Sequence, residues 1–230
     1  MSYEYVFNPD ICWYKGCCGK EGDECRANCL RYMEMDYLTS TSNIPRKMQY
    51  PVSLTPSKQD IQAFVRLKNI KDNIVEFVQE GHNLYLYSTN FGNGKTTWAT
   101  KLMLKYFDDI WAGNGFKCRG IFVHVPTFLT KLKENIGRKD SEFESLRDKL
   151  LAVDLVIWDD IAATTMGDYD HANLLTYIDQ RKLAGLSNIY TGNMGESQLR
   201  NALGNRLSSR VWNDSVIIEL VGADRRSSKW

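Results

Sequence analysis

Apolar residues along the chain fall into two alternating patterns. Short segments typical of strands, most of them rich in apolar residues, occupy residues 84–87, 120–125, 153–160, 187–193 and 216–220. Between these segments, apolar residues recur every three or four positions, as on one face of an amphipathic helix. Strands that alternate with helices in this way favour a parallel sheet covered by helices. The pattern therefore predicts an α/β fold with a five-stranded parallel sheet flanked by helices.

Several of the predicted helices have recognisable ends and buried faces. The first is predicted to begin at Thr55 or Ser57 and to end near Gly81. Its apolar face is formed by Ile61, Phe64, Val65, Ile70, Ile74 and Phe77. Later helices are predicted after residue 94, from residue 126, over residues 169–183 and around a stripe of Leu199, Leu203, Leu207 and Val211.

The junction between the first strand and the following helix carries the clearest chemical pattern. Its residues are Thr89, Asn90, Phe91, Gly92, Asn93, Gly94, Lys95, Thr96 and Thr97. Small residues let backbone N–H groups converge on a phosphate, and the positive end of the helix favours an anion. Lys95 would reach the terminal phosphates, and Thr96 would hold Mg²⁺. The segment matches a Walker A loop except at its first glycine, where this chain has Thr89.

Two acidic residues, Asp159 and Asp160, follow the third strand. They lie at its carboxyl end, where open parallel sheets bind ligands. The pair matches a Walker B motif, in which Asp159 would hold Mg²⁺ and Asp160 would orient or activate the attacking water. Two acids that end an exposed turn are the alternative, and the phosphate loop earlier in the chain argues against it. Asp160 is one methylene shorter than the usual glutamate, which bears on hydrolysis more than on nucleotide binding.

Five of the six cysteines lie in one short stretch: Cys12, Cys17, Cys18, Cys25 and Cys29. Thiolate ligation of a metal adds folding free energy where apolar material is scarce. Disulfides are disfavoured because the chain shows no secretion signal. The stretch favours zinc held by four of the five thiolates, with Cys17 or Cys18 as the fourth ligand. An iron–sulfur cluster and unmetallated thiols are the alternatives.

Composition divides the chain into three parts. Residues 1–37 form the cysteine-rich module, residues 38–54 are rich in Ser, Thr and Pro and suit a linker, and residues 55–230 hold the predicted strands of the α/β domain. No apolar stretch approaches the length of a membrane span, so we expect a cytoplasmic protein without a membrane partner.

The charges nearly balance, with 29 basic and 28 acidic residues and a net charge of +1. Without a global basic field, contact with single-stranded DNA would be local or multiplied by assembly. One locally basic segment contains Lys131, Lys133, Arg138 and Lys139. It would touch DNA in an assembled ring, or it is a solvated helix face, which is the commoner role of such charges. His124 lies in an apolar strand and is predicted to be packed rather than catalytic.

Taken in order, these features resemble the AAA+ ATPases and, within them, the bacterial and phage helicase loaders of the DnaC and DnaI type. The resemblance covers residues 55–230 and includes WDDIA, YTGNM, ALGNRLSSRV and GADRR. It implies a Mg²⁺-dependent ATPase in which Asn193 is the first sensor residue. It also implies that Arg210, with Arg206 as the second choice, is the finger that reaches a neighbour's nucleotide. Arg226, or Arg225, is similar to the loaders' terminal arginine, and the resemblance implies that, as in those loaders, no lid domain follows the fifth strand.

The resemblance implies a function as well. Such a loader hydrolyses ATP and delivers a DnaB-type replicative helicase onto single-stranded DNA during DNA replication, after self-association into a ring or spiral. The cysteine-rich module would grip the helicase, and the gene would be a phage gene. Two alternatives stay open: a transposition helper ATPase of the IstB type, and an adaptor or inhibitor of a host helicase that does not hydrolyse ATP.

Overall fold

A computed structural model describes residues 3–15, 18–19, 25–50, 53–138 and 140–222. Within them the strands are β1 (Asn83–Tyr87), β2 (Gly120–His124), β3 (Leu155–Asp159), β4 (Ser187–Gly192) and β5 (Val216–Glu219). The strands pair in parallel in the order β2-β3-β4-β1-β5. The prediction of a five-stranded parallel sheet flanked by helices is confirmed.

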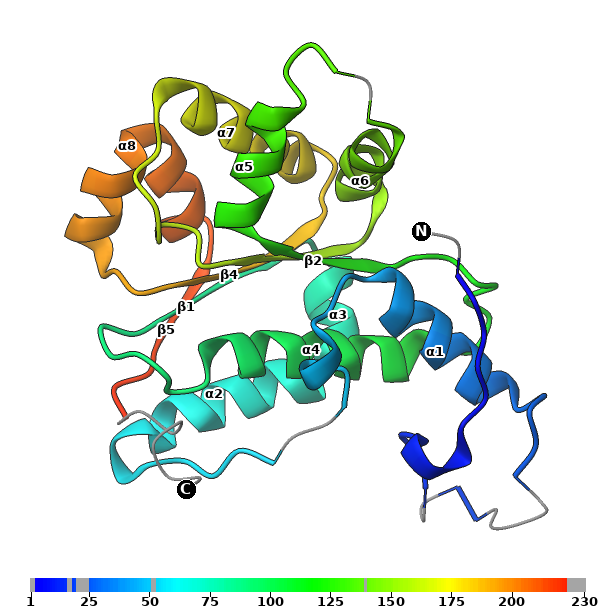
Figure 1. Ribbon diagram of the computed structural model, residues 1–230. Helices are drawn as coiled ribbons and strands as arrows, with labels where there is room; N and C mark the ends of the chain where they lie inside the picture. The colour runs from blue at the N-terminus through cyan, green and yellow to red at the C-terminus, as the bar shows by residue number, and fades with distance from the viewer. Residues whose placement is uncertain (1–2, 16–17, 20–24, 51–52, 139, 223–230) are drawn as a thin grey trace.

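Helices cover both faces of this sheet (Figure 1). One face carries α1 (Leu30–Thr41), α2 (Ile61–Asp72), α3 (Ile74–Gln79) and α4 (Lys95–Ile110). The other carries α5 (Val125–Glu134), α6 (Ser141–Ala152), α7 (Asp168–Leu183) and α8 (Glu196–Trp212). Short 3₁₀ turns lie at η1 (Pro9–Ile11), η3 (Arg46–Met48) and η4 (Lys58–Asp60). None of the described helices combines the length and the apolar character that crossing a membrane requires.

Successive side chains of a strand point to opposite faces of the sheet, and they contribute to two hydrophobic cores, one on each face. Leu84 and Leu86 of β1 join the core beneath α1 to α4, whereas Tyr85 between them joins the core beneath α5 to α8. Ile157 and Trp158 of β3 divide in the same way. All five residues of β3 are buried, as expected of a strand covered on both faces.

The single helix predicted over residues 55–81 is two helices. The break lies at Asn73 (φ −118°, ψ 30°), whose side-chain amide donates to the carbonyl oxygen of Asn69 at 2.9 Å. An asparagine that bonds the preceding turn in this way competes with the helical backbone. Ile61 and Val65, predicted on the buried face, are 49% and 58% exposed, so that face is narrower than predicted.

Helix α6 was not predicted from the apolar pattern. Its start is nonetheless marked in the sequence by Asp140, whose Oδ1 accepts hydrogen bonds from the backbone N–H groups of Glu142 (2.9 Å) and Phe143 (3.3 Å). A side chain that satisfies the first free N–H groups of a helix is a common N-cap. The cap is local, so the sequence could have revealed this helix.

The predicted boundary between a cysteine module and a linker, at residues 37 and 38, falls inside α1. Leu38 is fully buried in the same core as Leu102 of α4. Ile44, also predicted to lie in the linker, is 3% exposed. The linker prediction is therefore wrong for residues 38–44, because their apolar side chains pack on the domain.

Polar contacts also attach the amino-terminal segment to the end of α4. Tyr14 Oη donates to Asp108 Oδ1 at 2.6 Å, and Arg31 Nη2 donates to the same oxygen at 2.8 Å. The guanidinium of Arg31 lies over the Tyr14 ring, 3.4 Å from its centroid. Burial and the Asp108 carboxylate raise the pKa of Tyr14, which keeps its hydroxyl protonated as the donor.

We expect Tyr14→Phe to lower the free energy of unfolding by about 1 kcal/mol, because the Asp108 carboxylate loses one charge-assisted hydrogen bond. Urea denaturation followed by fluorescence measures this difference. Tyr169→Phe is the matched control, since Tyr169 is 45% exposed and its hydroxyl bonds to none of the described residues. Equal destabilisation in the two variants would show that the Tyr14 hydrogen bond contributes nothing.

Candidate nucleotide-binding site

The loop between β1 and α4 lies at the carboxyl edge of the sheet. Gly92 (φ 69°) and Gly94 (φ 99°) both adopt the left-handed conformation that favours glycine. Gly94 immediately precedes α4, so the free N–H groups of the first helical turn are directed toward the loop. Thr89, which stands where the motif expects glycine, is not among the residues with positive φ. A side chain at this position therefore causes no backbone strain.

Lys95 is folded into this loop and is 6% exposed. Its Nζ donates to the carbonyl oxygen of Asn90 at 3.3 Å and to Asn93 Oδ1 at 3.4 Å. Both acceptors are neutral, and a phosphate oxygen would be a stronger partner for the ammonium group. Asn93 in turn donates to Ser88 Oγ and, at 2.9 Å, to the carbonyl oxygen of Leu220. It thereby ties the loop to the ends of β1 and β5, a role that its sequence position did not suggest.

Asp159 joins this loop to the centre of the sheet. It is 5% exposed, and its Oδ1 accepts hydrogen bonds from Thr96 Oγ1 at 2.8 Å and from Thr191 Oγ1 at 2.7 Å. Burial raises the pKa of Asp159, and the two hydroxyl groups oppose this effect by stabilising the carboxylate. Thr96 and Asp159, predicted from separate motifs, are therefore brought into direct contact.

Thr191 belongs to this candidate site, although the sequence did not reveal it. It is fully buried on β4, and its Oγ1 also accepts a hydrogen bond from the backbone N–H of Asp160 at 3.1 Å. Asp160 has φ 57°, an uncommon conformation for a residue other than glycine, so this hydrogen bond helps to hold it. Asn193, predicted as the polar residue of this strand, directly follows the last residue of β4.

The prediction that His124 is packed inside a strand is wrong. His124 is the last residue of β2, and its side chain is 46% exposed. Its Nδ1 lies 2.8 Å from Thr127 Oγ1, and its Nε2 lies 3.9 Å from Asp160 Oδ2. Strand β2 is paired with β3, and this pairing brings the histidine beside the two acids.

Both candidate finger arginines lie on α8 after a kink at Gly204 (φ 69°). Arg210 Nε donates to Asp179 Oδ1 at 2.5 Å, and its Nη1 lies 3.7 Å from Asp214 Oδ2. Arg206 is exposed and forms no ion pair with the residues that the structure describes. Arg225 and Arg226 lie outside the described residues.

Four of the clustered cysteines line one cavity of about 640 Å³: Cys12, Cys18, Cys25 and Cys29. Burial raises the pKa of the Cys12 thiol, and the neighbouring thiols add to this effect. Among the described residues, no three of these sulfur atoms lie within 4.8 Å of one another. Cys17 lies outside the described residues. The zinc site therefore stays a prediction.

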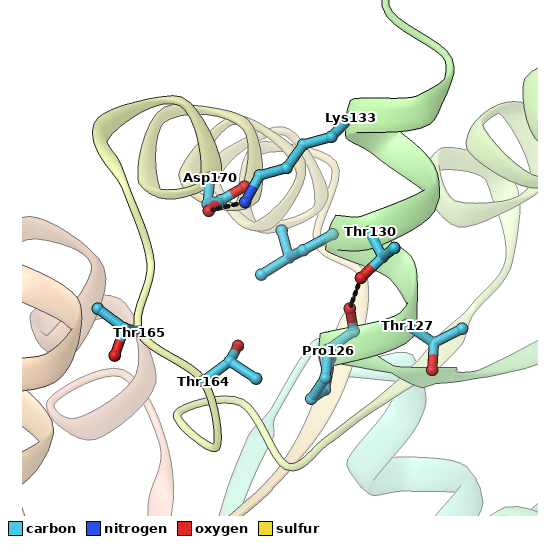
Figure 2. A pocket seen from close by; sticks show the side chains of 8 residues that line it. Pro126, Thr127, Thr130, Lys133, Thr164, Thr165 and Asp170 are labelled. Carbon is cyan, nitrogen blue, oxygen red and sulfur yellow. Dashed lines mark hydrogen bonds and ion pairs between the residues drawn. The ribbon is translucent and has the colours of Figure 1, made fainter.

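A smaller pocket of about 270 Å³ lies between α5, the loop after β3 and α7, and Thr127 is one of its lining residues (Figure 2). Lys133 extends from α5 across this pocket and donates to Asp170 Oδ2 at 2.7 Å (Figure 2). Asp170 is 1% exposed. A buried carboxylate thus neutralises Lys133, one of the four residues in the predicted basic segment. Lys139 lies outside the described residues.

The structure thus combines a parallel α/β sheet with a glycine-bearing loop that lies beside an acidic strand end. Among solved structures, the chain is similar to the DnaC helicase loader, with a TM-score of 0.60 and 18% identity over 73% of this chain and 93% of that one. It is also similar to DnaI, with a TM-score of 0.60 and 21% identity over 80% and 95% of the two chains.

A third similar structure is the replication initiator DnaA bound to AMPPCP and single-stranded DNA, with a TM-score of 0.55 and 16% identity. The match covers 73% of this chain and 48% of the initiator, so this chain spans about half of that protein. No protein-family model matches the sequence, and no curated protein matches it. At these identities the similarity shows the fold, and the predicted resemblance is confirmed at that level.

Proposed function

We propose that this protein is a Mg²⁺-dependent ATPase that loads a DnaB-type replicative helicase onto single-stranded DNA. The observation that carries the ATPase part is the hydrogen bond between Thr96 and Asp159, which joins the phosphate loop to the acidic strand end. The similarity to DnaC and DnaI supports the loader part, and the DNA-bound initiator supports single-stranded DNA as a partner.

The residues of the site fit Mg²⁺ and ATP. The oxygens of Thr96 and Asp159, 2.8 Å apart, are the hard ligands that Mg²⁺ prefers. Lys95 and the first N–H groups of α4 would hold the phosphates. When bound, the ion neutralises charge that develops on the transferred phosphoryl group. Asp160 would orient the attacking water, and Thr191 fixes its backbone.

We expect Lys95→Ala to lower ATP turnover by about 10²-fold or more, because the phosphates lose their positively charged donor. Phosphate release measures ATP turnover, and the binding of a fluorescent ATP analogue measures nucleotide affinity. Lys105→Ala is the matched control, since Lys105 lies on the same helix and pairs with Asp109. Unchanged turnover in the Lys95 variant would exclude this loop as the site. A parent protein that binds ATP without turnover would favour the adaptor that does not hydrolyse it.

The loader role is tested by capture from host lysate. Tagged Lys95→Ala protein is incubated with the lysate, and the retained proteins are identified by mass spectrometry. Recovery of the replicative helicase supports a loader or an inhibitor, and loading of that helicase onto circular single-stranded DNA separates the two. Recovery of a transposase instead would favour the transposition helper.

The amino-terminal cysteine segment is the proposed helicase contact and zinc site. Four of its cysteines share a cavity, which supports a common ligand. Metal analysis of the purified full chain tests this proposal: about one equivalent of zinc per chain is expected, and less than about half an equivalent would count against it. Loss of helicase binding on replacing these cysteines would support the contact.

A further inference from the structure

We propose that His124, Asp159 and Asp160 form a site for a divalent first-row transition cation, such as Mn²⁺, in preference to Mg²⁺. Among the described residues, these three form the one group of His, Cys, Asp or Glu whose ligand atoms all lie within 4.8 Å of one another. The proposal deepens the proposed function because it shares Asp159 with the Mg²⁺–ATP position. It can nevertheless be tested without nucleotide.

The ligand atoms come from two paired strand ends. His124 is the partner of Asp159 in the register of β2 and β3, and Asp160 directly follows. The distance of 3.9 Å between His124 Nε2 and Asp160 Oδ2 is too long for a hydrogen bond. Two ligands of one ion lie at most about 4.2 Å apart when each is about 2.1 Å from the metal. The distance between these two atoms therefore fits a shared ion.

Asp159 offers an oxygen that the described residues leave without a hydrogen bond. Both hydroxyl hydrogen bonds, from Thr96 and Thr191, go to its Oδ1. Its Oδ2 accepts none from the described residues. The side chain is only 5% exposed, and a second carboxylate follows it in the chain. Two neighbouring carboxylates, one of them buried, call for a compensating positive charge.

His124 is oriented as metal-bound histidines are. Its Nδ1 lies 2.8 Å from the Thr127 hydroxyl in the first turn of α5. When this hydroxyl accepts a hydrogen bond from Nδ1–H, the lone pair of Nε2 is left on the side of Asp160. A hydrogen bond to the second ring nitrogen is the usual outer support of a metal-bound imidazole.

The donor set decides which cation is favoured. Two carboxylates alone suit Mg²⁺, which takes oxygen ligands and dehydrates reluctantly. An imidazole nitrogen adds affinity for first-row transition cations, for which Mg²⁺ is a poor competitor. Mn²⁺ is the appropriate probe because it accepts carboxylate and imidazole ligands but has little affinity for thiolates, so the cysteines do not interfere.

The test is a titration of chelator-treated, nucleotide-free full chain with Mn²⁺, in which electron paramagnetic resonance reports the free ion. We expect one site whose affinity falls about 10-fold or more in His124→Ala and about 10-fold in Thr127→Val. His82→Ala is the control, since exposed His82 pairs with Glu80 away from the acids. Mg²⁺ should displace Mn²⁺ only in large excess.

Equal Mn²⁺ affinity in the parent and His124→Ala, or displacement by equimolar Mg²⁺, would overturn the proposal. Binding of a fluorescent ATP analogue with Mg²⁺, measured on the same variants, keeps the two hypotheses apart. If His124→Ala loses the Mn²⁺ site but still binds ATP, the result supports both the cation site and the proposed function. A parent protein that binds Mn²⁺ through His124 but no ATP would refute only the proposed function.

Discussion

Replacing Arg210 with alanine is expected to lower ATP turnover per subunit by about 10³-fold in the assembled protein while ATP binding is retained. An arginine supplied by a neighbouring subunit adds positive charge to the transition state, so its loss affects turnover and not ground-state binding. In the single chain Arg210 is held by Asp179 at 2.5 Å. Its side chain is 37% exposed, and ion pairs at such positions contribute about 1 kcal/mol or less. The finger role proposed for Arg210 therefore requires only that this weak pair be exchanged for a phosphate of a neighbouring subunit.

Arg206→Ala is the matched comparison, because Arg206 lies one helical turn earlier on α8. Turnover is measured against protein concentration, and turnover per subunit of the parent should rise as the protein assembles. A collapse in the Arg206 variant with normal turnover in the Arg210 variant would assign the finger to Arg206. Turnover independent of concentration in the parent, with both variants active, would exclude a finger on α8.

Replacing Arg181 with alanine is expected to give the largest loss of stability, about 3 kcal/mol or more. Arg181 is fully buried on α7, and its Nη1 donates to the carbonyl oxygens of Leu150 (2.6 Å) and Val153 (2.9 Å). Its other nitrogens donate to Ser187 and Asn188 at the start of β4. Burial lowers the pKa of Arg181 to about 10. Alanine would leave several buried acceptors without a donor, each costing about 1–3 kcal/mol.

Thermal and urea denaturation of Arg181→Ala measure this loss. Arg200→Ala is the control, since Arg200 forms an exposed ion pair with Glu196 one turn away on α8, worth about 0.3–0.5 kcal/mol. Arg181→Lys should recover little of the stability that is lost in Arg181→Ala, because an ammonium group cannot reproduce the spread of donors of a guanidinium. If Arg181→Ala and Arg200→Ala unfold at the same temperature and urea concentration, the buried contacts of Arg181 do not stabilise the fold.

The fold could be predicted because its signals are local. Most of the strands are short segments rich in apolar residues, and β3 is buried throughout, so its sequence is almost continuously apolar. The candidate phosphate loop and Asp159 could be proposed for the same reason, since each motif lies within a few residues.

Other site residues depend on pairing between distant segments. Thr191 is one of several polar residues in its strand, and only the pairing of β4 with β3 brings it to Asp159. His124 reaches Asp160 only because β2 pairs with β3. The linker prediction failed for a related reason: Ser and Thr are common near residue 40, but the tertiary packing of Leu38 outweighs local composition.

Helix α4 connects the candidate phosphate loop to the contacts of the amino-terminal segment. Its first residue, Lys95, belongs to the phosphate loop, and Asp108 near its last turn is held by Tyr14 and Arg31 of the amino-terminal segment. Its sixteen helical residues span roughly 24 Å. The contacts of the amino-terminal segment and the loop that would hold the phosphates therefore lie at opposite ends of one continuous helix.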